Sequence, residues 1–169
     1  LLGLGVNAFN KMKPAVLSSS IQMAIIMKIY PEFDASKGID SQMQTMARKD
    51  KKAAQGLETV EFQVDLLYNS PLEEQAADLL EIVEQGQEAE EMIIDLTNRY
   101  LKQDLAGLWE LMQKDSEPEE LEKLVYGRNR NWVSQMKDIM PQTPTMFVVG
   151  AGHLPGEQGL IKLLEQEGY

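Results

Sequence analysis

The only histidine of the 169 residues, His153, lies in a glycine-rich turn near the carboxyl end of the chain. The turn follows the apolar run Met146 to Val149, which predicts a short buried strand. A strand that ends in such a turn holds side chains at the carboxyl edge of a sheet, where ligands bind in open α/β proteins. Imidazole titrates near neutral pH and is a common metal ligand. His153 is therefore a candidate catalytic or metal-binding residue, with Gly150 and Gly152 as candidate binding positions.

Two glutamates could complete such a site, because one histidine cannot build a metal centre by itself. Glu58 ends a brief strand that we predict over residues 52–58, and Glu61 lies in the first turn of a helix that we expect to begin at Thr59. Both are candidate catalytic residues, and Glu58 is also a candidate metal ligand. A carboxylate near a helix N-terminus is also favoured by the helix dipole alone. That simpler explanation stays open, above all for Glu61.

Basic and amide side chains gather in the segment Arg128–Trp132, whose sequence is Arg-Asn-Arg-Asn-Trp. Two arginines and two asparagines at a helix start can bind an anion or a carboxylate. Arg128 is therefore a candidate catalytic residue and Asn129 a candidate binding residue. The alternative is a capped, solvated helix start. The chain has no serine in a nucleophile elbow and no phosphate-binding loop.

Composition indicates an ordinary globular domain: 169 residues, 43% of them hydrophobic. The net charge of −11 argues against binding to nucleic acid. The absence of cysteine excludes disulfides and thiolate chemistry. No apolar run is long enough to predict a membrane span. Because the chain begins at Leu1 rather than Met, any targeting segment would lie outside it.

Helical patterns dominate the chain and must position these residues. Helices are predicted over residues 16–29, 39–48, 59 onward, 70–85, 88–101, 104–114, 116–126, 129–140 and 159–167. Gly127 is expected to end the helix before it. The fold class is thus α/β or α+β, predominantly helical with a few short strands. Two strands do not form a stable sheet alone, so they either pair with strands outside this chain or share a small sheet covered by helices.

Taken together, three motifs resemble the TraB/GumN family, which also includes the animal Tiki proteins. Their order and approximate spacing are similar to those of the GumN-like bacterial branch, over roughly the whole chain. The residues that carry the resemblance are Gly56–Gln63, Arg128–Trp132 and Phe147–Gly156, supported by Gly38–Asp40, Gly159–Leu164 and Gly168-Tyr169.

The resemblance implies a metal-dependent hydrolase, and the Tiki members are described as metalloproteases. The family pattern has two Gly-x-x-His motifs, of which Gly150-Ala-Gly-His153 matches the second and none matches the first. Residues 1–169 therefore resemble a single region from the carboxyl-terminal part of a longer protein, a partial domain of a larger α/β fold. The amino-terminal part would supply the other histidine and the central strands.

The resemblance also implies roles for the candidate residues. His153 would be a metal ligand or an acid/base group, and Glu58 a ligand or a base that activates water. Arg128 would polarise a carbonyl group or hold a substrate carboxylate. A divalent metal ion is expected in the full-length protein, whereas none is expected to bind tightly to this chain alone.

A second hypothesis is a non-enzymatic helical module for binding or regulation. An enzyme requires Glu58, Arg128 and His153 to converge in one cleft, whereas a binding module requires an exposed apolar patch. For the enzyme we expect a peptide or small-molecule substrate. A homo-oligomer is expected if absent strands leave apolar surface exposed. A periplasmic, secreted or lipid-anchored location is expected if the amino-terminal part carries a signal peptide.

Overall fold

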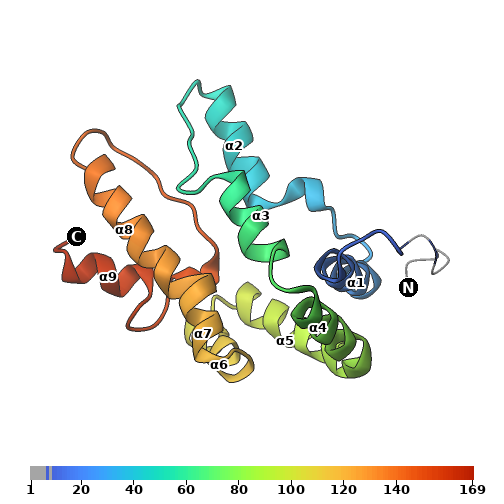
Figure 1. Ribbon diagram of the computed structural model, residues 1–169. Coiled ribbons are helices and arrows are strands. Elements are labelled where there is room, and N and C mark those ends of the chain that lie inside the picture. The colour runs from blue at the N-terminus through green and yellow to red at the C-terminus, as the bar shows by residue number, and fades with distance from the viewer. Residues whose placement is uncertain (1–6, 8) are drawn as a thin grey trace. The chain divides into compact units, whose positions relative to one another are not determined.

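The computed structural model describes residue 7 and residues 9–169, apart from the side chain of Asp115. The chain is predominantly helical (Figure 1). It divides into two compact units, Leu1–Asp95 and Leu96–Tyr169, and the boundary falls within helix α5 (Gln87–Leu101). The candidate residues His153, Arg128 and Asn129 belong to the second unit.

The first unit contains α1 (Pro14–Ile29), the 3-10 turn η2 (Ala35–Lys37), α2 (Ile39–Lys49), α3 (Val60–Tyr68), α4 (Leu72–Gln85) and the beginning of α5. As predicted, α3 begins after Thr59, whose hydroxyl oxygen accepts a hydrogen bond from the amide of Phe62 at 3.1 Å. Helices α1 and α4 pack together. Ile25 of α1 is buried in this unit.

Gln75 connects α1 to the start of α4 and is only 1% exposed. Its amide nitrogen donates to the carbonyl of Ser70 at 2.7 Å, and its amide oxygen accepts from the backbone N–H of Ala15 at 3.2 Å. The serine before Pro71 is a typical helix cap, and the helix was predicted to begin at residue 70. Instead, Pro71 occupies the N-cap position without a side-chain hydrogen bond, and Gln75 satisfies the carbonyl of Ser70 from within the helix.

The second unit contains the end of α5, then α6 (Leu105–Asp115), α7 (Pro118–Leu121), the π turn η3 (Glu122–Tyr126), α8 (Gly127–Ile139), the 3-10 turn η4 (Ala151–His153) and α9 (Leu160–Gln166). Helix α8 packs on α9, and η4 packs on α6. The core that these contacts bury is made of large apolar side chains: Leu108, Leu121, Val125, Trp132, Val133, Met136 and Leu160.

Helices α7 and α8 run together through the π turn without a break (Figure 1). The expectation that Gly127 ends a helix is therefore wrong. Gly127 has the helical angles φ −60° and ψ −39°, and its N–H donates to the carbonyl of Glu122, five residues earlier. A Cβ atom on Gly127 would lie 3.1 Å from that carbonyl oxygen. Glycine here allows the close backbone approach of the π turn.

The two predicted strands are not formed. Residues 52–58 and 146–149 are irregular, and no strand occurs anywhere in the described part of the chain. Both predictions rested on β-branched, aromatic or small residues next to glycine. Such a composition favours a strand only where another strand supplies hydrogen bonds and packing. The fold class is confirmed as predominantly helical, but the few short strands were wrong.

Among the described residues, no helix combines the length and the apolar character that crossing a membrane requires.

Candidate functional site

Asn129 is the centre of the candidate site, and its side chain has no exposed surface. It projects from α8 toward the loop that follows η4. Its amide nitrogen donates to the backbone carbonyl of His153 at 3.1 Å and to that of Gln158 at 2.8 Å. One buried amide thus ties both ends of the segment 153–158 to α8.

The imidazole of His153 contacts the same asparagine. Its Nδ1 lies 2.7 Å from the amide oxygen of Asn129. The ring also packs against Trp132, with 4.4 Å between ring centroids and an angle of 44° between the planes. The backbone N–H of His153 donates to the carbonyl of Gly150 at 3.0 Å and closes the 3-10 turn η4. The histidine is therefore held by its ring and by its backbone.

Arg128 approaches the other ring nitrogen of His153. Its Nη1 lies 3.4 Å from Nε2, although the two residues are 25 positions apart. The guanidinium carbon lies 4.9 Å from the centroid of the Trp132 ring, within the range of a cation–π contact. The same Nη1 donates to the carbonyl of Leu124 at 2.9 Å. Leu124 belongs to the π turn, a feature that is frequent at functional sites.

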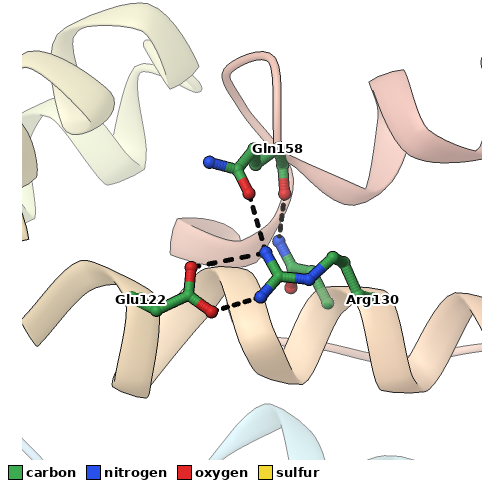
Figure 2. Close-up of polar contacts among 4 residues, drawn as sticks. Glu122, Arg130 and Gln158 are labelled. Carbon is green, nitrogen blue, oxygen red and sulfur yellow. Dashed lines mark hydrogen bonds and ion pairs between the residues drawn. The ribbon is translucent and has the colours of Figure 1, made fainter. Parts of the chain in front are cut away.

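Arg130 makes a second connection between α8 and the loop after η4. Its guanidinium pairs with the carboxylate of Glu122, and Nη1 donates to the side-chain oxygen of Gln158 at 2.8 Å (Figure 2). The side chains of Arg130 and Glu122 are about half exposed, at 49% and 51%. Exposed ion pairs contribute little stability. Arg130 therefore adds less to this connection than the buried Asn129.

The glycines of the histidine turn serve different purposes. A Cβ atom on Gly150 would meet only His153 Cδ2, at an ordinary 3.7 Å. A Cβ atom on Gly152 would lie 2.7 Å from the sulfur of Met112, so this glycine allows η4 to approach α6. Gly156 has φ +84° and faces the ring of Trp109, which a Cβ atom would approach to 2.8 Å. Position 156 therefore requires glycine for two reasons, the positive φ angle and the lack of space for a Cβ atom.

Glu58 and Glu61 lie in the first unit. Glu58 is half-buried just before α3, and its carboxylate accepts from the side-chain amide of Gln63 at 3.3 Å. Glu61 is exposed in the first turn of α3. The second unit therefore brings together three of the predicted residues, Arg128, Asn129 and His153. That the two glutamates converge with them stays a prediction.

The donor atoms of the second unit do not fit a metal centre by themselves. Nδ1 of His153 faces the amide oxygen of Asn129, so its ring offers Nε2 as a metal ligand, and the Arg128 guanidinium lies 3.4 Å from that nitrogen. Throughout the described residues, no three histidine or carboxylate side chains are grouped closely enough to hold a metal ion. A catalytic zinc site usually needs three protein ligands. Any metal centre that includes His153 must take further ligands from elsewhere.

Two residues of the site were not predicted from the sequence. Trp132 is buried, and its contacts with His153 and Arg128 were not predicted. Gln158 contributes through its backbone carbonyl as well as its side chain. Every residue has a backbone carbonyl, so no residue type could have identified this one.

The site thus defines a helical protein in which a buried asparagine, a histidine and an arginine meet between α8 and the turn after residue 149. The sequence model of the TraB/PrgY/gumN family matches residues 2–169. The chain therefore belongs to the TraB/PrgY/gumN family. Neither the curated proteins nor the solved structures include a significant match to it.

Proposed function

We propose that this chain carries part of the active site of a hydrolase of the TraB/GumN/Tiki type, with a peptide as its substrate class. What supports the proposal is the approach of Arg128 Nη1 to His153 Nε2 at 3.4 Å, in a cluster held by the fully buried Asn129. Hydrolysis requires a group that moves a proton and a group that stabilises negative charge. An imidazole beside a guanidinium provides both.

In this proposal His153 transfers the proton, and Arg128 stabilises the negative charge that develops on the carbonyl oxygen of the substrate. Trp132 packs against both side chains and is only 5% exposed. A large apolar ring at this position lowers the local dielectric constant, which strengthens the electrostatic interaction of the guanidinium with an oxyanion. Asn129 keeps the histidine turn in place during the reaction.

The test is hydrolysis of a fluorogenic peptide library by the full-length protein and its His153→Ala and Arg128→Ala variants. We expect each substitution to lower kcat/KM by about 100-fold or more. The matched control is Asn131→Ala, an exposed residue of the same helix, which should retain activity. Activity that survives His153→Ala would overturn the catalytic assignment. A wild-type protein that cleaves no peptide in the library would favour the non-enzymatic binding module instead.

We also propose that the hydrolase depends on a divalent metal ion. A divalent ion would be held by His153 and Glu58 together with ligands from outside this chain, and it would activate water. Because His153 is the only histidine of the chain, we expect the 169 residues alone to bind zinc or manganese weakly. Calorimetry with zinc chloride and manganese chloride measures this. Tight one-to-one binding would contradict the incomplete site.

A further inference from the structure

We infer that Asn129 is a positioning residue that fixes His153 in one tautomer, with the proton on Nδ1 and the lone pair on Nε2. This inference deepens the proposed function and rests on it only for the catalytic use of Nε2. The hydrogen-bonding geometry itself requires no substrate. The tautomer depends on the orientation of the Asn129 amide, whose oxygen and nitrogen have nearly the same shape.

Two backbone carbonyls determine that orientation. The oxygens of His153 and Gln158 lie 3.1 Å and 2.8 Å from the same side-chain atom of Asn129. Carbonyl oxygens only accept hydrogen bonds, so the atom that faces both must be the NH2 group, which has two hydrogens to donate. A flipped amide would place an acceptor against two acceptors inside the protein. The amide oxygen must therefore face the ring of His153.

The amide oxygen then determines the tautomer of the imidazole. It lies 2.7 Å from Nδ1, and an amide oxygen can only accept. A neutral imidazole has one N–H group, so that hydrogen must be on Nδ1 and the lone pair on Nε2. Arg128 supports the same assignment from the other side of the ring. Its guanidinium has donors only, and Nη1 lies 3.4 Å from Nε2.

The burial of Asn129 prevents its amide from rotating, which fixes the tautomer of His153. Asn129 has no exposed surface, and among the described side chains no buried polar atom lacks a partner. Rotation of the amide would break three hydrogen bonds that water cannot replace at a fully buried position. In free histidine the Nε2–H tautomer predominates, so the fold selects the less common form. A lone pair on Nε2 is what a general base or a metal ligand at this nitrogen requires.

The presence of a single histidine allows a direct test. A long-range proton–nitrogen NMR spectrum of the 15N-labelled 169-residue chain shows one imidazole. It is recorded over a pH series that is extended upward until the shifts no longer change, so that the neutral ring is observed. We expect a protonated-type shift for Nδ1 and a lone-pair-type shift for Nε2. The reverse pattern, or averaged shifts like those of free histidine, would overturn the inference.

The Asn129→Ser variant tests whether the asparagine is the cause. We expect its His153 signals to move toward the Nε2–H pattern, while Asn131→Ser leaves them unchanged. In the full-length protein, Asn129→Ser should lower kcat by about 10–100-fold with little change in KM. A shifted tautomer with unchanged kcat would overturn the positioning role. If the variant does not fold, the wild-type spectrum still decides the tautomer, and it does so even if the protein proves not to be a hydrolase.

Discussion

Replacing Asn129 with leucine is expected to lower the free energy of unfolding of the second unit by about 3–5 kcal/mol. Leucine has the same branched arrangement of four side-chain heavy atoms but cannot make hydrogen bonds. The substitution would leave the carbonyls of His153 and Gln158 and the ring Nδ1 of His153 without their partner. A buried polar group that loses its partner costs about 1–3 kcal/mol. Here three part-buried hydrogen bonds converge on one fully buried side chain, so the loss exceeds that of an ordinary hydrogen-bond deletion.

Tryptophan fluorescence during denaturant unfolding measures this change, because both tryptophans of the chain, Trp109 and Trp132, lie in the second unit. The control is Asn131→Leu, two residues further along α8 and exposed, which should change the stability by less than about 0.5 kcal/mol. Equal effects of the two substitutions would mean that the buried amide contributes no more than a surface one. The conclusion that Asn129 holds the segment 153–158 on α8 would then be wrong.

The helices could be predicted from the sequence because their signals are local. The pattern from Ile39 to Arg48 predicted α2 to within one residue of its observed end at Lys49. Thr59 was expected at the start of a helix and is the N-cap of α3. Side-chain capping and the spacing of apolar residues need only a few neighbouring positions, so they remain visible in a sequence without any knowledge of packing.

The strands and the end of one helix could not be predicted because they depend on distant or unusual backbone contacts. Residues 146–149 have the composition of a strand, yet the described part of the chain offers them no strand to pair with. Gly127 is typical of a helix end, but here it lies within a helix, where its small size fits the carbonyl of Glu122. A π turn has no sequence signal comparable to a capping residue.

The candidate site was partly predicted. Arg128, Asn129 and His153 were singled out by residue type, and the structure brings all three together. The sequence could not show that Asn129 is fully buried and makes three hydrogen bonds. That arrangement arises from the folding of the loop 153–158 onto α8, a contact between segments more than twenty residues apart. Whether Glu58 joins the site stays a prediction, because it belongs to the other unit.

Replacing Gly159 with alanine is also expected to lower the stability of the second unit strongly, through a steric clash rather than through lost hydrogen bonds. Gly159 is buried at the start of α9, with φ −74° and ψ 155°, which any residue can adopt. A Cβ atom there would nevertheless lie 2.3 Å from the carbonyl oxygen of Leu154 and 2.2 Å from that of Pro155. These are backbone atoms of a tight loop, so they cannot rotate away. We expect Gly159→Ala to destabilise the second unit by about 2–4 kcal/mol.

The matched control, Gly150→Ala, is expected to have the opposite sign. Gly150 has φ −61° and an added Cβ atom would make only an ordinary contact of 3.7 Å, so alanine should stabilise the unit by about 0.4–1 kcal/mol by restricting the unfolded chain. The same denaturant unfolding measures both variants. If Gly159→Ala and Gly150→Ala changed the free energy of unfolding by the same amount and in the same direction, the close approach of the loop backbone to Gly159 would not govern stability.

Gly159 and Asn129 should also prove coupled. The carbonyl that Asn129 holds at 2.8 Å belongs to Gln158, the residue immediately before Gly159. A side chain at position 159 pushes that segment of the loop outward, so it removes part of what the asparagine binds. The double variant Asn129→Leu with Gly159→Ala should therefore lose less stability than the sum of the two single losses, by at least about 0.5 kcal/mol. Strict additivity would mean that the loop and α8 are held together by contacts other than this amide.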